Sequence, residues 1–362
     1  MVLVLGSGFM FQIMGIIDIR QDVFMLLDNL PLLFLAALSI GKTISMVYML
    51  PKIKLLLIKI QEYYLSSKAN EESKLYNSHV LYGRNLSSAY TYIILSHSIL
   101  WNVTMLLTKL KRTETTKNDT FSNEIASDQV GVPYRVNYMI DVDTYYAPIF
   151  IHTAACCVCY VFQEIAIDVL YITLIEHCRG LLATVRYCLE NALSKNNGDV
   201  SIKMSTRDQS YLNVIYIVRR HAETIQFINL INTVFSPSVF LHIGYVTLCL
   251  SILGYQLLIN VDNSNDLVKY ICFINAIIIN IFFENWQGQK IIDSSEKVFE
   301  SVYNTEWYNM PISTRKLLLM IMMRSIKPMV VTASKFMILS YITFNTMMRT
   351  SMSYFMLLRS VT

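Results

Sequence analysis

Residues 224–261 read TIQFINLINTVFSPSVFLHIGYVTLCLSILGYQLLINV and contain no Asp, Glu, Lys or Arg. A helix needs about 20 mostly apolar residues to cross the hydrocarbon core of a bilayer. This uncharged stretch of 38 residues is longer than that. It therefore predicts a membrane-spanning helix over 226–260, and it indicates an all-α membrane protein.

The composition of the whole chain points the same way. Of its 362 residues, 15% are charged and 54% are hydrophobic, whereas a soluble domain carries about 25% charged residues. The mean hydropathy is +0.42. These values exclude a disordered chain and argue against a soluble globular enzyme, and they make the lipid bilayer the expected partner. A net charge of only +4 gives no reason to expect a nucleic-acid partner.

Other apolar runs predict six further spans in a single domain that covers 1–362. The run at 23–50 includes Asp28 and Lys42, and the run at 330–358 includes Lys335 and Arg349. The polar segments between the spans carry apolar residues at helical spacing, so we expect helices to extend into the cytoplasm. Besides 226–260, the expected spans are 1–19, 23–50, 87–108, 145–172, 266–285 and 330–358.

The distribution of basic residues predicts how the chain is oriented. Segments 52–86, 176–225 and 286–328 together hold 19 Lys and Arg, and the alternate segments hold six. Because cytoplasmic loops carry the excess of Lys and Arg, we expect a cytoplasmic N-terminus and an extracellular C-terminus. Asn118 begins the motif Asn118-Asp119-Thr120 in an outer segment and is a candidate glycosylation site.

The sequence contains no recognisable catalytic or metal-binding pattern. Its six histidines form no HExxH motif, and no glycine-rich phosphate-binding loop is present. Cys156, Cys157 and Cys159 lie close together, but no further pair of ligands at the usual spacing completes a zinc site. We expect no enzyme activity, no cofactor and no metal.

The last third of the chain resembles the C-terminal region of insect odorant receptors. It reads ENWQGQKIIDSSEKVFESVYNTEWYNMPISTRKLLLMIMMRSIKPMVVTASKFMILSYITFNTMMRTSMSYFMLLRS over 284–360. The similarity covers 145–362 well and the first 140 residues loosely, and it is most like receptors of wasps, bees and ants. The matching elements include Gly288-Gln289, Ser294-Ser295, Trp307-Tyr308 with Pro311, Lys327-Pro328, Ser353-Tyr354-Phe355 and, upstream, Glu176-His177-Cys178-Arg179-Gly180.

The resemblance implies a ligand-gated cation channel in the plasma membrane of olfactory neuron dendrites. In that family a subunit tuned to a small volatile ligand assembles with a common odorant coreceptor into a heterotetramer. This chain is similar to a tuning subunit, because its segment between spans four and five lacks the coreceptor's long insertion. Family members begin with a cytoplasmic stretch, whereas Met1 here falls inside the first apolar run. An N-terminally truncated, non-functional receptor therefore remains an alternative.

The last span suggests where ions pass. At 3.6 residues per turn, Thr346, Thr350, Ser353, Leu357 and Ser360/Val361 share one helical stripe, with hydroxyls inside and an apolar outer end. That pattern suits a hydrated path closed by a hydrophobic constriction. By resemblance, Leu357 and Val361 match the gate positions, with Ser360 beside them. The alternative is that these small hydroxyl residues hold neighbouring helices together.

The resemblance places the ligand pocket in the outer half of the membrane, among spans two, three, four and six. Such a site needs aromatic walls and few polar groups. Trp101 is the foremost candidate, because its ring can stack and its N–H can orient a ligand. For every candidate, ordinary helix packing is the alternative. The candidates are Phe24 and Leu27; Ile94, His97 and Trp101; His152, Cys156 and Tyr160; and Tyr270, Phe273 and Ile277.

Two further inferences concern assembly and the competing classes. Trp307 and Tyr308 lie in the family-like cytoplasmic helical region 286–328, where we expect contact between subunits. A gustatory receptor of the same superfamily would carry a different motif in its last span, and the Ser353-Tyr354-Phe355 ending is of the odorant type. A secondary transporter would show paired helix breaks near the midplane, and Pro31, Pro148 and Pro237 show no such pairing.

Overall fold

The computed structural model describes residues 2–66, 71–118, 131–140, 144–194, 203–260 and 264–361, and most of them are helical. A single two-stranded hairpin interrupts the helices near the C-terminus of this described part. In chain order the elements are α1 (Val2–Asp18), α2 (Val23–Tyr48), α3 (Leu50–Ser66), α4 (Glu71–Asn118), α5 (Tyr146–Ser194), α6 (Lys203–Ile259), α7 (Ser264–Tyr303), the 3-10 turn η2 (Trp307–Asn309), α8 (Ile312–Ser325), β1 (Thr332–Ala333), β2 (Met337–Ile338) and α9 (Tyr341–Val361).

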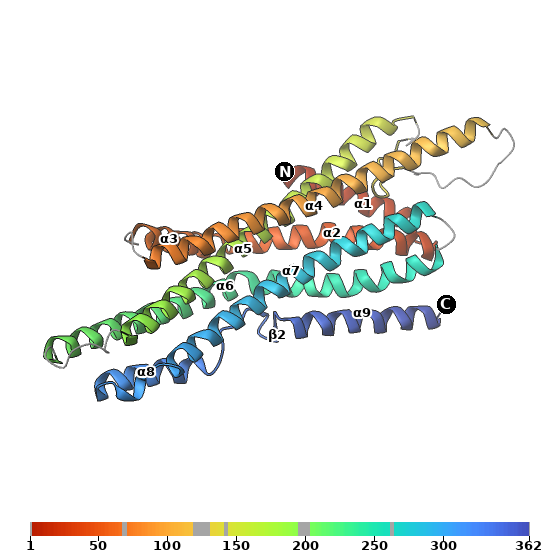
Figure 1. Cartoon of the computed structure of the whole chain (residues 1–362). Helices are drawn as coiled ribbons and strands as arrows, with labels where there is room; N and C mark the ends of the chain where they lie inside the picture. Colours follow the sequence, from red (N-terminus) through yellow and green to blue (C-terminus); the bar gives the residue numbers. More distant parts are fainter. Residues whose placement is uncertain are drawn as a thin grey trace.

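The helices form an elongated bundle in which the longest members run nearly its whole length (Figure 1). α6 has 57 residues, which corresponds to roughly 85 Å at about 1.5 Å per residue. The hydrocarbon core of a bilayer is only about 30 Å thick. α4, α5, α6 and α7 therefore extend well beyond a membrane, as their polar ends require.

Five of the described helices contain windows long and apolar enough to cross a membrane. α1 is apolar but shorter, with 17 residues, and α9, with 21 residues, is not among the five. The windows lie in Val23–Tyr48, Glu71–Leu110, Tyr146–Asn191, Ser210–Ile259 and Leu267–Tyr303.

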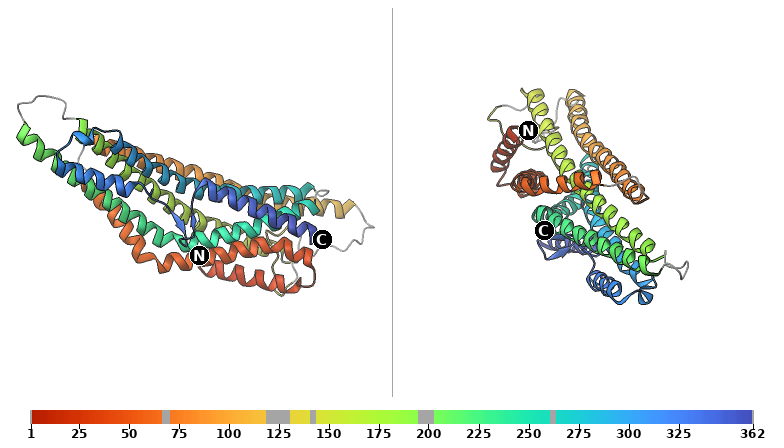
Figure 2. Two further views of the ribbon diagram at one scale, coloured as in Figure 1. Left: turned by 90° about the horizontal axis from the view of Figure 1, so that it is seen from below. Right: turned by 90° about the vertical axis from the view of Figure 1, so that its left-hand side faces the viewer.

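The helices pair in a way that gives the bundle two sides. α4 packs along α5, α2 along α6, α5 along α7, and α9 along α6 and α7. α4 lies on one side of the bundle and α9 on the opposite side, as both the side view and the end-on view show (Figures 1 and 2). One face of α9 is consequently left without a neighbour in the described chain.

Two hydrophobic clusters hold the bundle together. The larger one joins α5, α6, α7, α8 and α9 and includes fully buried Leu174, Ile231 and Ile281. The smaller one lies at the end of the bundle nearest α1, where Leu5 and Val136 pack against the start of α5. The space between these two clusters is where a cavity remains.

The last helix begins later than the expected span 330–358, at Tyr341. The preceding residues form an antiparallel hairpin, in which Thr332 pairs with Ile338 and Ala333 with Met337. Asn232 on α6 explains the difference, because its amide donates to the carbonyl of Val330 at 2.8 Å and accepts from the N–H of Thr332 at 2.9 Å. These tertiary hydrogen bonds satisfy backbone groups that a helix would otherwise satisfy itself.

Gly288 on α7 allows the hairpin to approach closely. A Cβ atom at this position would overlap the backbone carbonyl and the side chain of Leu339. The side chain of Asn285, one turn earlier, accepts a hydrogen bond from the N–H of Ser340 at 3.2 Å. The close approach that Gly288 permits and the hydrogen bond from Ser340 to Asn285 therefore hold the start of α9 against α7.

Candidate functional site

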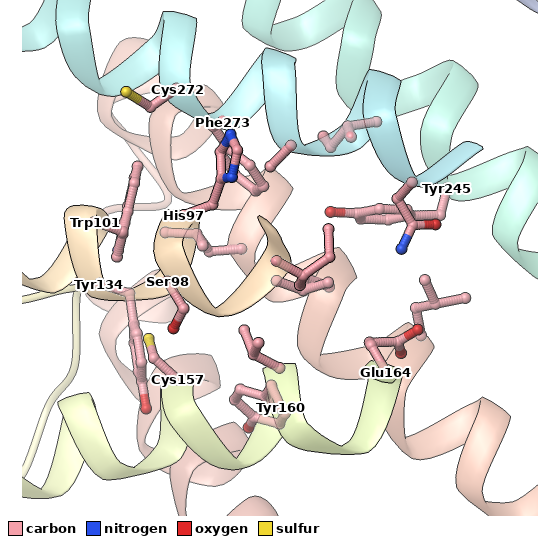
Figure 3. Close-up of a pocket in the computed structure, with 18 of the residues that line it drawn as sticks. His97, Ser98, Trp101, Tyr134, Cys157, Tyr160, Glu164, Tyr245, Cys272 and Phe273 are labelled. Atoms are coloured by element: carbon pink, nitrogen blue, oxygen red, sulfur yellow. The ribbon is translucent and has the colours of Figure 1, made fainter. Parts of the chain in front are cut away.

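A cavity of about 150 Å³ lies inside the bundle, in the half that holds α1. Its walls come from α1, α2, α4, α5, α6 and α7 and from Tyr134 in the segment before α5 (Figure 3). Most of the surface that faces it is apolar. The lining residues are Gln12, Leu32, Leu35, Leu38, Ile94, His97, Ser98, Trp101, Tyr134, Cys157, Tyr160, Val161, Glu164, His242, Tyr245, Cys272, Phe273, Ala276, Ile277 and Asn280.

Six of the residues expected from the sequence meet at this cavity. Ile94, His97 and Trp101 share one face of α4, as their spacing requires. The ring of Trp101 lies 5.5 Å from that of Phe273 on α7, measured between centroids, and the planes are tilted by 58°. Tyr160 on α5 and Ile277 on α7 complete the six.

The expected residues of α2 do not line the cavity. Phe24 is 57% exposed near the start of the helix, and Leu27 is also absent from the walls. α2 contributes Leu32, Leu35 and Leu38 instead, because the cavity lies about one to three turns further along the helix.

His152 and Cys156 also lie elsewhere, on the face of α5 that α1 and the preceding segment cover. The ring of His152 bonds to the hydroxyls of Ser7, at 3.2 Å, and Tyr138, at 2.5 Å. Cys156 is fully buried, and its thiol donates to the carbonyl of Val4 at 3.4 Å. The face of α5 that borders the cavity is offset by about one residue and carries Cys157, Val161 and Glu164.

Tyr270 is likewise buried away from the cavity. Its hydroxyl donates to Asp28 Oδ1 at 2.7 Å, and Lys269 Nζ lies 2.9 Å from both oxygens of the same carboxylate. This cluster ties α7 to the first turns of α2. Asp28, which interrupts the apolar run of the second span, therefore has a structural partner.

Residues of α6 are the part of the site that sequence reasoning missed. His242 and Tyr245 line the cavity from α6, a helix that was not expected to contribute. Both lie in the uncharged stretch 224–261, where hydropathy alone gives no sign that one face turns towards a cavity. Gln12 and Tyr134 are further additions, and they enter because α1 and the segment before α5 cover the bundle at this level.

Below the cavity lies a buried ionic network that joins α2, α5, α6 and α7. Lys42 contacts Glu164 and Glu284, and the latter contacts His242 Nδ1 at 2.9 Å. All four residues are at most 8% exposed. Buried charges are tolerated only when they are paired and hydrogen-bonded, so this network fixes the relative positions of the four helices.

A second polar group continues the network towards α4. The hydroxyl of Tyr90 donates to the carboxylate of Asp168. The amide nitrogen of Asn280 donates to Tyr90 Oη at 2.8 Å and to Asp168 Oδ2 at 3.1 Å. Asn280 and Glu164 belong both to these polar groups and to the cavity wall. The floor of the cavity is therefore polar, whereas its sides are aromatic and aliphatic.

The expected pore residues lie on the unpartnered face of α9. Ser353, Leu357 and Ser360 are exposed, Thr350 is half-buried, and the side chain of Val361 lies outside the described residues. The opposite face packs on the bundle through Met347 and Ser351, which are 2% and 4% exposed. The hydroxyls of Thr350, Ser353 and Ser360 donate to carbonyls of their own helix.

Trp307 and Tyr308 lie in η2 and differ in exposure. Trp307 is half-buried and packs against the larger hydrophobic cluster, whereas Tyr308 is 57% exposed. Asn118 is the last residue of α4, but its side chain and the rest of its glycosylation motif lie outside the described residues. Within the described residues no group of three or more His, Cys, Asp or Glu is arranged to hold a metal ion.

Comparisons with known proteins place this architecture among insect chemoreceptors. A family profile described as 7tm Odorant receptor matches residues 22–352. Putative odorant receptor 85d of Drosophila melanogaster is 26% identical over 144 residues, which is 40% of this chain and 35% of that protein. The odorant receptor coreceptor of Anopheles gambiae is 24% identical over 173 residues, which is 47% of this chain and 35% of that protein. These alignments span about a third of the length of either relative.

A solved structure shares the fold over the whole chain. The insect olfactory receptor OR5 from Machilis hrabei, determined in complex with eugenol, superposes with a TM-score of 0.79 at 15% identity. The match covers 100% of this chain and 88% of that one. The expected fold class, an all-helical membrane protein with seven transmembrane helices, is confirmed.

Proposed function

This chain belongs to the seven-transmembrane odorant receptor family, and we propose that it is a tuning subunit. In this proposal the protein binds a small volatile ligand in the outer half of its helix bundle. Binding opens a cation channel that the protein forms with the common odorant coreceptor, as a heterotetramer in the plasma membrane of olfactory neuron dendrites. It is not an enzyme.

The observation that carries the proposal is the cavity behind Trp101. An apolar cavity of about 150 Å³ is large enough for a molecule of the size of benzene. Aromatic and aliphatic side chains form most of its surface, and a few polar groups converge at one end. Small-molecule sites generally have this construction. The cavity also lies between helices that pack on α9, which connects ligand binding to the proposed pore.

The unpartnered face of α9 supports a channel. Its hydroxyl residues are already bonded to their own backbone, so their remaining lone pairs can face water or ions. Leu357, 59% exposed at the outer end, would provide the hydrophobic constriction. Packed around a common axis, four such helices would line a hydrated path, and Tyr308 would meet a neighbouring subunit below the membrane.

Two contacts connect the cavity to this helix. Ser251 on α6 donates to the carbonyl of Ser351 on α9 at 3.1 Å, and Asn285 on α7 accepts from the N–H of Ser340. The cavity residues His242 and Asn280 lie on the same two helices. A ligand that shifts α6 or α7 would therefore shift α9.

Whole-cell current tests the proposal directly. Cells that express this chain with an insect coreceptor should give cation currents to some members of a broad panel of volatiles. The same volatiles should evoke no current in cells that express this chain alone. Equal currents in both would exclude the tuning-subunit role, and no current from protein present at the surface would contradict the proposed function. A response to soluble tastants alone would favour the gustatory alternative.

A further inference from the structure

The polar end of the cavity contains hydrogen-bond acceptors that have no partner. Glu164 is 8% exposed, and only its Oε2 atom is paired, at 2.6 Å from Lys42 Nζ. Its Oε1 atom is buried without a hydrogen bond, and so is Oδ1 of Asn280. Both residues line the cavity. Leaving a buried polar atom unsatisfied costs about 1–3 kcal/mol and more when the group is charged, so these two atoms call for a partner.

The orientation of the Asn280 amide is fixed by its neighbours. An ionised carboxylate such as that of Asp168 only accepts hydrogen bonds, so the amide nitrogen must face Asp168 Oδ2, at 3.1 Å. The amide oxygen is then the atom of Asn280 that is left without a partner, in a residue that lines the cavity. Neither this oxygen nor the free carboxylate oxygen of Glu164 can donate.

The two ends of the cavity differ in chemistry. Figure 3 shows Glu164 and Tyr245 at one end and Trp101 and Tyr134 at the other, with His97 and Tyr160 between them. An occupant therefore meets aromatic rings with most of its surface. At the Glu164 end it meets two acceptor oxygens and the hydroxyl of Tyr245, which is also buried without a hydrogen bond. In the described part of the chain, the carboxylates of Glu164, Asp168 and Glu284 gather around the ammonium of Lys42, and the ring of His242 lies against Glu284.

We propose that the cavity is selective for a small aromatic or aliphatic molecule with one hydrogen-bond-donating head group, a hydroxyl or an amine, seated between Glu164 Oε1 and Asn280 Oδ1. This inference rests on the proposed ligand-binding function and defines its substrate class. A carbonyl, ether or ester at that end would face these two acceptors and could accept a hydrogen bond from the Tyr245 hydroxyl alone. Such molecules bind less well than a donor of the same shape.

Ligands that differ only in the head group test the inference without altering the protein. Benzyl alcohol and anisole are isomers with the same ring, and only the alcohol donates a hydrogen bond. Benzylamine adds a donor that carries charge, and ethylbenzene has neither donor nor acceptor. Each is applied to cells that express this chain with a coreceptor, and each is also tested for raising the melting temperature of the purified protein.

The expected result is that benzyl alcohol or benzylamine acts at a concentration at least about tenfold lower than anisole and ethylbenzene, since a hydrogen bond to a charged group has this effect or a larger one. If benzylamine is the stronger, the head group is cationic, and if benzyl alcohol is the stronger, it is neutral. Equal responses to all four compounds overturn the inference. So does silence to all four in cells that respond to other volatiles lacking a donor.

Two variants locate the head group. Glu164→Gln keeps an acceptor oxygen and removes the charge, so it should abolish a preference for benzylamine over benzyl alcohol. Glu190→Gln makes the same change on the same helix, at an exposed position where the carboxylate contacts Arg186 and Ser301, and should leave the preference intact. An unchanged preference in Glu164→Gln contradicts the placement. If Glu164→Gln does not reach the surface, the four ligands on the unaltered chain still decide the matter.

The failure of this inference is distinguishable from the failure of the proposed function. Volatile-evoked currents with no preference for donors leave the receptor function standing and exclude the selectivity. The absence of any volatile-evoked current from surface protein contradicts both.

Discussion

Lys42 Nζ lies 2.6 Å from Glu164 Oε2 and 4.0 Å from Glu284 Oε1, and the lysine is 1% exposed. This lysine interrupts the apolar run of the second helix, and its charge is neutralised by carboxylates on α5 and α7. Lys42 and these two carboxylates therefore join α2, α5 and α7 at the base of the cavity.

Lys42→Met should destabilise the protein strongly, because it leaves two buried carboxylates without their shared cation. Removing one partner of a buried pair costs about 3–5 kcal/mol. The melting temperature of the purified protein and its surface expression should both fall. Lys74→Met is the matched control, since its pair with Glu71 is 75% and 64% exposed and an exposed pair contributes little to stability. Equal losses in the two variants would show that the Lys42 network is not structural.

Trp101→Ala should reduce sensitivity to ligand by about tenfold or more, because the cavity loses the ring that packs against Phe273 and an aromatic pair alone contributes about 0.5–1.5 kcal/mol. The measurement is a dose–response curve for whichever volatile activates the unaltered receptor, at matched surface expression. Tyr92→Ala removes another aromatic ring from α4, at a position that is 74% exposed, and should leave the curve unchanged. A similar shift in both variants would mean that the cavity does not hold the ligand.

Cysteine substitution on α9 should separate the proposed pore face from the other exposed face. Ser353→Cys and Leu357→Cys place a thiol on the hydroxyl stripe, where a charged, water-soluble thiol reagent should block the ligand-evoked current. Met352→Cys is also exposed, at 58%, but lies about 100° around the helix from Ser353. It should react little if that face meets lipid. Block at Met352 without block at Ser353 would contradict the pore assignment.

Acidification should destabilise the part of α5 that lies beyond the membrane. Burial lowers the pKa of His177 to about 3, and its Nδ1 faces the hydroxyl of Tyr76 at 2.5 Å. The unfolded pKa is near 6.5, so below that pH the unfolded chain binds a proton that the folded chain does not. The contribution of neutral His177 to the free energy of unfolding is full above pH 6.5. It decreases as the pH falls from 6.5 towards 3, and at pH 5 it has decreased by about 2 kcal/mol.

The His177→Asn variant tests that dependence. Asn keeps an acceptor for the Tyr76 hydroxyl but does not titrate, so the difference in melting temperature between pH 7.5 and pH 5 should shrink relative to the unaltered protein. An identical difference in the two proteins would assign the acid sensitivity to other groups.

Gly288→Ala should weaken the attachment of the hairpin to α7, because the new methyl group overlaps the backbone of Leu339. Overpacking of this kind costs about 1–3 kcal/mol. Gly244→Ala is the matched control, since no atom lies within 4 Å of a Cβ built there and alanine favours a helix by about 0.5–1 kcal/mol. We expect a lower melting temperature for the first variant and an unchanged or higher one for the second. The reverse order would exclude the close approach.

Sequence reasoning was most successful along single helices. The face shared by Ile94, His97 and Trp101 follows from the period of a helix, and the structure places all three at one cavity. His152 and Cys156 share a face with Tyr160 by the same rule, yet α1 and the segment before α5 cover the first two, and Tyr160 alone of the three lines the cavity. The helical period shows which residues share a face, but it does not show which neighbouring element packs against that face.

The beginning of the last helix shows the same limit at the level of the backbone. Residues 330–340 are as apolar as a membrane helix, but Asn232 and Asn285 supply hydrogen bonds that hold them as a hairpin and a turn. Those partners lie about 100 and 55 residues away in the chain, so no local pattern could reveal them.

The sequence by itself determined what depends on composition and period: the all-helical membrane class, the order of the apolar helices and, through the resemblance of 284–360, the receptor family. Only the tertiary structure decided which faces meet. It brought His242 and Tyr245 to the cavity, paired Lys42 with Glu164, and left one face of α9 uncovered. The physical reason is that apolar transfer into lipid depends on each segment separately. Packing and hydrogen bonding between helices depend instead on atoms that the chain brings together only when it folds.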